Sequence, residues 1–198
     1  MTTVPIPAWT PIGVLPPFDA LAGAESASRS PYNVSLSDVV LRFGTTSDRQ
    51  RVLDGLIRYR AALHAVGLTV GFQWLNGSFM ENIESLEGRS PNDVDVVTFF
   101  QLPLGMTQAT VAAAAPQIFP MTPPQRLTFK GHYFVDPYPV DLASPPDRLV
   151  KLSAYWYSVW SHRRDSSWKG YLQIDLSPAA DAAASAQLRV AAGSGATP

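Results

Sequence analysis

Residues 71–100 read GFQWLNGSFMENIESLEGRSPNDVDVVTFF and contain two expected strands and an acidic pair. The runs 69–75 and 96–100 are rich in apolar, aromatic and β-branched residues, which is the composition of buried strands. Asp93 and Asp95 stand just before the second run. Because strand side chains alternate in direction, the two carboxylates share one face, about 7 Å apart, and repel each other. Mg²⁺ favours one or two carboxylates completed by water and phosphate oxygens, so the pair indicates a divalent metal site.

A Gly-Ser pair, Gly77 and Ser78, precedes the acidic pair on an expected turn. Gly-Ser followed by Asp-x-Asp at the start of an apolar strand resembles the signature of the nucleotidyltransferase superfamily, whose fold is typified by DNA polymerase β. In that family the Gly-Ser turn holds a nucleotide triphosphate at a helix N-terminus, the two aspartates hold Mg²⁺, and a third carboxylate completes the site. The resemblance implies that Gly77 and Ser78 bind nucleotide and that Asp93 and Asp95 are catalytic metal ligands.

The interval between Ser78 and Asp93 is longer than in the smallest family members, which indicates a loop insertion within 81–90. Each half of the motif also has a plainer interpretation. Asn-Gly and Gly-Ser are common loop dipeptides, and Asn92-Asp93 fits a turn before a strand on which Asp95 is solvated. The two halves together, at this spacing, favour the nucleotide site.

Two aspartates compete for the role of third carboxylate. Both lie in the run 127–142, which has strand composition, with Pro137 and Pro139 placing its second half at a sheet edge or in irregular structure. Asp141 lies in a Val-Asp-Leu triplet that resembles a motif of some minimal family members. The resemblance of the chain to an uncharacterised bacterial family of nucleotidyltransferase-like proteins favours Asp136 as the third catalytic and metal-binding residue, and leaves the other aspartate to cap a loop.

The whole chain also resembles an uncharacterised bacterial family of nucleotidyltransferase-like proteins. That resemblance includes three later segments: Tyr155-Trp156, Ser161-His162-Arg163-Arg164-Asp165 and Trp168-Lys169-Gly170. The turn 161–170 concentrates cations, and arginine and lysine near a triphosphate neutralise its oxygens. We therefore expect Arg163 and Lys169 to bind nucleotide, with a surface turn of salt bridges around Asp165 as the alternative.

Composition limits the class of protein. The chain has 198 residues, enough for one domain with a real core. A net charge of −1 and a charged fraction of 16% exclude a strongly basic nucleic-acid-binding protein and an acidic disordered one. Without cysteine there is no disulfide framework and no cysteine-based zinc site. The first residues lack the basic region of a signal peptide, and no apolar run approaches the ~20 residues of a membrane helix. We expect a cytoplasmic protein that does not enter a membrane.

Three regions are expected along the chain: a proline-rich arm over 1–31, a nucleotidyltransferase-like domain over 32–176, and a tail over 177–198 that begins as a short helix and becomes disordered. Four apolar residues should attach the arm to the domain: Trp9, Ile12, Leu15 and Phe18. Apolar spacing and capping residues predict helices near 35–44, 48–66, 107–115 and 144–160, and alternation predicts a last strand over 171–176. Four arginines of the long helix are expected on a solvated face: Arg49, Arg51, Arg58 and Arg60.

These observations predict an α/β or α+β fold, a small mixed sheet flanked by helices with the site at one end of the sheet. The resemblance implies Mg²⁺- or Mn²⁺-dependent transfer of a nucleoside monophosphate from a nucleoside triphosphate to a hydroxyl of RNA, protein or a small molecule. Many family members are toxins or defence factors that act beside a partner protein. The alternative is a catalytically inactive protein of the same fold that binds a partner, as an antitoxin or an assembly subunit.

Overall fold

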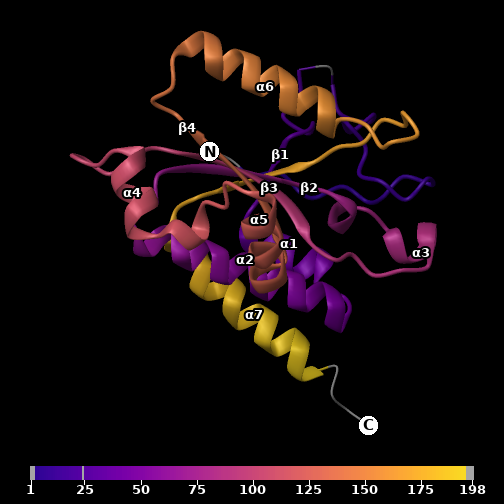
Figure 1. The fold of residues 1–198 in the computed structure, drawn as a ribbon. Helices are drawn as coiled ribbons and strands as arrows, with labels where there is room; N and C mark the ends of the chain where they lie inside the picture. The colour runs from indigo at the N-terminus through magenta and orange to yellow at the C-terminus, as the bar shows by residue number, and fades with distance from the viewer. Residues whose placement is uncertain (1–2, 24, 195–198) are drawn as a thin grey trace.

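A five-stranded mixed sheet runs through the middle of the molecule (Figure 1). The computed structural model describes residues 3–23 and 25–194, which form this sheet and seven α-helices. The strand order is β1-β5-β2-β3-β4; β2 is antiparallel to β3 and β5, whereas β3–β4 and β1–β5 are parallel pairs. The strands are β1 (Tyr32–Asn33), β2 (Gly71–Asn76), β3 (Val94–Phe100), β4 (Val135–Asp141) and β5 (Leu172–Asp175). The predicted mixed sheet flanked by helices is confirmed.

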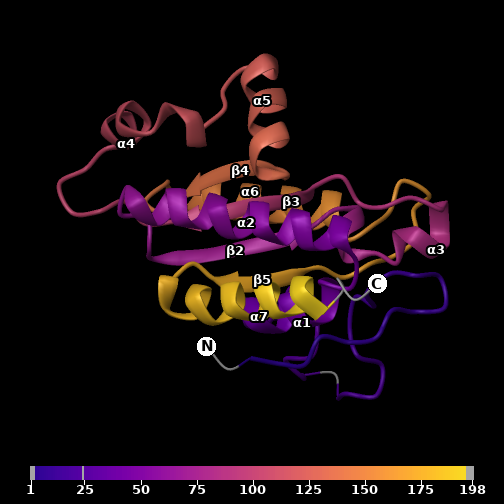
Figure 2. The same ribbon diagram turned by 90° about the horizontal axis from the view of Figure 1, so that it is seen from below.

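Helices cover both faces of the sheet. Figure 1 shows α6 above the sheet and α1, α2 and α7 below it, and the view from below in Figure 2 shows α5 beyond β4. The helices are α1 (Leu36–Phe43), α2 (Ser47–Ala65), α3 (Ile83–Glu87), α4 (Gln108–Ala114), α5 (Pro123–Tyr133), α6 (Pro146–Trp160) and α7 (Asp181–Ser194). Short 3₁₀ helices occupy Ser78–Met80, Pro116–Ile118 and Pro178–Ala180. None of the described helices is long and apolar enough to span a membrane.

Two apolar clusters fix which side of the sheet each strand residue faces. Val94 and Val96 belong to the larger cluster, which includes side chains of α1, α2 and α7. Val97 and Phe99 belong to the smaller cluster beneath α6, together with Trp74, Val140, Trp156, Trp160 and Tyr171. Because side chains alternate along a strand, Asp95 faces the α6 side, as does Asp136 of the neighbouring strand.

The composition of the run 127–142 predicts a strand in its first half, but that half is helical instead. Thr122 and Gln125 form a capping box, and prolines occupy the first turn of α5, so a helix starts before the apolar run. Tertiary packing then holds the helix, with the Phe129 ring 5.3 Å from that of Tyr59 on α2. The second half is β4, an edge strand, which is the first of the two alternatives that its prolines left open.

The arm is attached less evenly than expected. Leu15 is buried and Trp9 packs against the larger cluster, but Ile12 and Phe18 are 51% and 53% exposed. Backbone hydrogen bonds supply the remaining attachment: Val4 N–H donates to Asn33 O, and Gly170 N–H donates to Leu15 O, at 2.8 and 2.7 Å.

The tail forms a longer and better packed helix than expected. Helix α7 has 14 residues, and Ala184 and Leu188 of its inner face are buried in the larger cluster. Residues 195–198, where disorder was expected, lie outside the described residues.

The four arginines of α2 do not share one solvated face. Arg51 and Arg58 are at the surface, as expected, whereas Arg49 and Arg60 are almost completely buried. Arg60 forms an ion pair with Asp181 of α7 at 2.7 Å and a hydrogen bond to Gln73 Oε1 at 2.7 Å. A buried guanidinium needs such partners because transfer from water is costly without them. The expectation for Arg49 and Arg60 was wrong.

Candidate functional site

Three polar residues lie side by side across β2, β3 and β4 at one end of the sheet. Asn76 is paired in register with Asp95, and Asp95 with Asp136. Asp93 is two residues before Asp95, just ahead of β3. Asp141 is at the opposite end of β4, in register with Phe100. The structure therefore brings Asp93, Asp95 and Asp136 together, and we call these three residues the acidic group. Asp141 lies outside it.

A cavity of about 740 Å³ opens at this end of the sheet. Its wall is formed by the ends of β2–β4, by α6, and by the two loops 77–93 and 161–169. We call it the acidic cavity. It is lined by all seven residues that the sequence nominated: Gly77, Ser78, Asp93, Asp95, Asp136, Arg163 and Lys169.

The Gly77-Ser78 turn lies against the acidic group. Gly77 has φ +89°, a strained conformation for other residues, and a Cβ atom there would come 3.0 Å from Asp95 Oδ2, so a larger residue would have to displace that carboxylate. The helix that begins at Ser78 is a single 3₁₀ turn, Ser78–Met80. Among the described residues, the Ser78 hydroxyl has no hydrogen-bond partner.

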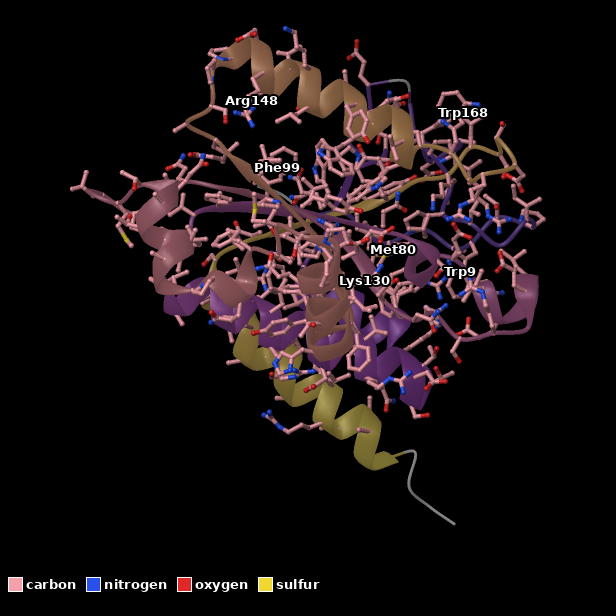
Figure 3. The ribbon with its side chains drawn as sticks, viewed as in Figure 1. Trp9, Met80, Phe99, Lys130, Arg148 and Trp168 are labelled. Atoms are coloured by element: carbon pink, nitrogen blue, oxygen red, sulfur yellow. The ribbon has the colours of Figure 1, made fainter. Side chains whose placement is uncertain are left out.

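The backbone of residues 79–81, directly after the turn, accepts hydrogen bonds from α2 and from the N-terminal arm. Arg49 donates hydrogen bonds to the carbonyl oxygens of Phe79 and Glu81, at 2.8 and 2.6 Å, and forms an ion pair with Glu84 at 2.6 Å. From the arm, Trp9 Nε1 donates to the Met80 carbonyl oxygen at 2.8 Å (Figure 3). Sequence reasoning missed Arg49 as a positioning residue.

A signal for Arg49 was present in the helical spacing. Arg49, Leu53, Leu56 and Arg60 follow one another at intervals of four, three and four residues, which places them on one face of α2. A charged residue in line with an apolar stripe is expected to be buried and paired.

Two cations of α5 hold the acidic group. Lys130 Nζ lies 2.6 Å from Asp93 and 3.2 Å from Asp136, and so bridges the two carboxylates. Arg126 forms a second ion pair with Asp136, to which the Tyr138 hydroxyl also donates at 3.1 Å. Arg126 and Lys130 are four residues apart and share a helix face, a relation that was missed because this run was expected to be a strand.

Asp95 is the carboxylate whose negative charge is least compensated. Burial, and then the neighbouring charges of Asp93 and Asp136, raise its pKa to about 6. Burial works against the charge of Lys130, but the hydrogen bond to Asp93 and the two carboxylate charges outweigh it and raise the pKa of this ammonium. Additional positive charge beside Asp95 would therefore be favourable.

The donor chemistry of the acidic group fits a hard divalent cation, because all three side chains supply carboxylate oxygens. As they stand, no three acidic or histidine side chains among residues 3–23 and 25–194 are arranged to hold one ion. Asp93 and Asp136 are directed to Lys130 and Arg126 instead. Mg²⁺ coordination by this group thus requires Lys130 to move away.

The cations of the second loop are largely neutralised. Lys169 and Arg163 both form ion pairs with Glu81, at 2.8 and 3.0 Å, and Arg163 also pairs with Glu87 at 3.1 Å. Lys169 is only 7% exposed and Glu81 only 5%. Arg164 is exposed and lines the cavity, and its guanidinium makes no ion pair or side-chain hydrogen bond with a described residue. It was not among the residues that the sequence nominated for nucleotide binding.

Helix α6 contributes an aromatic wall. Trp156 and Trp160 are buried, whereas Tyr155 and Val159 are 56% and 48% exposed, and all four line the cavity. Asn76 also lines the cavity; its Nδ2 donates to the Trp160 carbonyl oxygen at 3.1 Å, whereas its buried Oδ1 has no hydrogen-bond partner among the described residues.

The chain belongs to a family of unknown function, DUF6932, which it matches over residues 7–175. Neither a curated protein nor a solved structure matches it.

Proposed function

We propose that this protein is a cytoplasmic Mg²⁺- or Mn²⁺-dependent nucleotidyltransferase, which transfers a nucleoside monophosphate from a nucleoside triphosphate to a hydroxyl of RNA, protein or a small molecule. One observation carries the proposal. Asp95 and Asp136 are paired in register on parallel strands, with Asp93 and the Gly77-Ser78 turn beside them on one wall of the acidic cavity. The volume of about 740 Å³ lies within the usual range for small-molecule sites.

The residues of the cavity have separate roles in this reaction. Asp93, Asp95 and Asp136 would hold the divalent ion, which supplies positive charge to the reacting phosphate. The unpartnered Ser78 hydroxyl and the exposed Arg164 side chain donate to phosphate oxygens. A carboxylate of the acidic group orients the acceptor hydroxyl and takes its proton, while the hydroxyl oxygen bonds to the α-phosphorus and pyrophosphate leaves.

Thermal unfolding with each of the four nucleoside triphosphates, with and without Mg²⁺ or Mn²⁺, tests the proposal. A ligand that binds the native state raises the melting temperature, and at 100 times its Kd it adds about 2.7 kcal/mol of stability. We expect a shift that needs the metal, and pyrophosphate release once a suitable acceptor is supplied.

The double variant Asp93→Asn/Asp95→Asn should lose the metal-dependent shift and keep its fold, because the carboxylates that repel each other become neutral amides. Asp141→Asn is the matched control and should retain the full shift, because Asp141 lies at the far end of β4. Normal metal-dependent nucleotide binding by the double variant would show that the site is elsewhere.

A second function is favoured by the cations already present. Lys130 and Arg126 satisfy Asp93 and Asp136 in the way expected of a catalytically inactive protein of the same fold, which binds nucleotide or a partner protein without metal. Nucleotide binding that is independent of metal, or co-purification of a partner without nucleotide binding, would support this alternative over the enzyme.

A further inference from the structure

Five cationic side chains line the acidic cavity: Arg89, Lys130, Arg163, Arg164 and Lys169. Three of them pair with glutamates of the loop after the Gly-Ser turn. Arg89 lies 2.8 Å from Glu87, and Arg163 and Lys169 both pair with Glu81. Arg164 is exposed at the rim. Lys130 differs from all of these, because its partners are carboxylates of the proposed metal site.

Lys130 can leave those carboxylates more readily than Lys169 or Arg163 can leave Glu81. Its side chain is 35% exposed, whereas the Lys169–Glu81 pair is almost completely buried. Arg126, one turn earlier on α5, remains on Asp136 when Lys130 moves. The four-carbon stem of a lysine lets its ammonium move several ångströms without displacement of the helix.

The two positions of Lys130 are linked by charge. While its ammonium holds Asp93 and Asp136, it competes with any divalent cation for the same oxygens. Once Asp93 and Asp136 are bound to a divalent cation, Lys130 has lost its anionic partners beside a site that receives a triphosphate. Phosphate oxygens on the same cavity wall are the nearest replacement, and a charge-assisted hydrogen bond to them compensates the loss.

We propose that Lys130 is the phosphate-binding cation of this site, and that it exchanges Asp93 and Asp136 for the triphosphate when a divalent cation binds. This inference rests on the proposed function. It assigns to α5 the role that the sequence had assigned to Lys169. It also makes metal and triphosphate binding cooperative, because Lys130 opposes the first and supports the second.

The variant Lys130→Met tests this by changing two affinities in opposite directions. Titration with Mn²⁺ alone should show binding about fivefold tighter than in the parent, because the competing ammonium is absent. Titration with inorganic tripolyphosphate at saturating Mn²⁺ should show binding roughly tenfold weaker, the size expected for a lost hydrogen bond between charged groups. Lys151→Met, at an exposed pair on the outside of α6, is the matched control and should change neither affinity.

Amine labelling of the unaltered chain, read by mass spectrometry, supplies a second measurement that needs no variant. Labelling of Lys130 relative to Lys151 should rise about threefold with Mn²⁺ and fall again when tripolyphosphate is added. Two outcomes would overturn this inference and leave the proposed function standing, provided that the parent binds Mn²⁺. In the first, Lys130→Met changes neither affinity; in the second, Mn²⁺ does not change the labelling of Lys130. If the parent binds no Mn²⁺, both are overturned.

Discussion

The two ends of the parallel β3–β4 pair each carry a carboxylate of β4 beside a cavity, yet they differ in chemistry. At one end Asp136 faces the acidic cavity of about 740 Å³. At the other, Asp141 borders a hollow of about 430 Å³, which we call the apolar hollow, lined mainly by Phe100, Leu102, Val111, Phe119, Val140 and Leu152. Gln108 Nε2 donates to Asp141 at 2.8 Å, as does the Ala143 N–H.

Neighbouring strands explain the difference. Asp136 lies opposite Asp95 across the parallel register, whereas Asp141 lies opposite Phe100. A lone carboxylate at a strand end is satisfied by an amide and a backbone N–H. A group of carboxylates repels itself and must be balanced by cations, which here come from α5. Whether an aspartate of β4 belongs to a candidate metal site therefore depends on the residue that it faces across the strand register.

The largest expected effect separates these two aspartates. Asp136→Asn should lower nucleotidyl transfer by at least about 100-fold, the usual size of a lost catalytic carboxylate, while nucleotide binding through the Gly77-Ser78 turn survives in part. Asp141→Asn should change transfer less than about twofold, because it only replaces one partner of Gln108. The measurement is the rate of pyrophosphate release at saturating nucleotide. The reverse ranking would mean that the apolar hollow is the reactive end.

The next effect concerns how each end holds its cations. Lys169→Met leaves Glu81 buried with one partner fewer, and we expect a loss of about 3 kcal/mol in the free energy of unfolding, by chemical denaturation. Arg148→Met is the comparison at the apolar hollow, where the arginine is exposed and makes no ion pair with a described residue, so its loss should stay below about 0.5 kcal/mol.

The sequence predicts that Lys169 binds nucleotide, whereas the burial of its ion pair with Glu81 indicates that it stabilises the fold. A weaker affinity for Mn²⁺–tripolyphosphate with unchanged stability in Lys169→Met would restore the earlier interpretation.

Local pattern was enough to predict where the candidate residues at the ends of β2 and β3 lie. The Asp-x-Asp alternation predicted that Asp93 and Asp95 share one face, and both line the acidic cavity. The prolines of β4 predicted a sheet edge or irregular structure, and β4 is an edge strand. Both signals are local, because they depend on backbone periodicity and on the missing N–H of proline. The choice of Asp136 over Asp141 needed the resemblance as well.

The cations of the site could not be predicted in the same way. The shared helix face of Lys130 and Arg126 was not predicted, because the aromatic and β-branched run after Leu127 has the composition of a strand. Tertiary packing against α2 overrides that composition. The pairing of Lys169 with Glu81 joins residues 88 positions apart, and no periodic pattern reports such a contact. Charge pairing across loops is a property of the folded chain.

The buried carboxyl group of Asp95 should also make the free energy of unfolding depend on pH. The pKa of Asp95 is about 6 in the folded chain, against about 3.9 for an unfolded aspartate, so the folded state binds more protons between these values. Stability in the presence of a chelator should therefore fall as pH rises from 4 to 7. Two pKa units correspond to about 3 kcal/mol, and solvent screening should reduce this to about 1–2 kcal/mol. Denaturation of Asp95→Asn should lack this part of the slope; an equal slope in both proteins would contradict the assignment.

The smallest expected effect comes from the two glycines that turn the chain near the two ends. Gly77 and Gly105 have φ of +89° and +77°, so alanine should cost each on the order of 1–2 kcal/mol in backbone strain. A Cβ at Gly105 meets nothing within 4 Å, whereas at Gly77 it lies 3.0 Å from Asp95 Oδ2. Gly77→Ala should therefore lose about 1 kcal/mol more than Gly105→Ala, and it alone should weaken metal-dependent nucleotide binding, because the displaced carboxylate belongs to the acidic group. Equal losses of stability, with nucleotide binding intact in both variants, would show that the close approach of the Gly-Ser turn to Asp95 contributes nothing to the site.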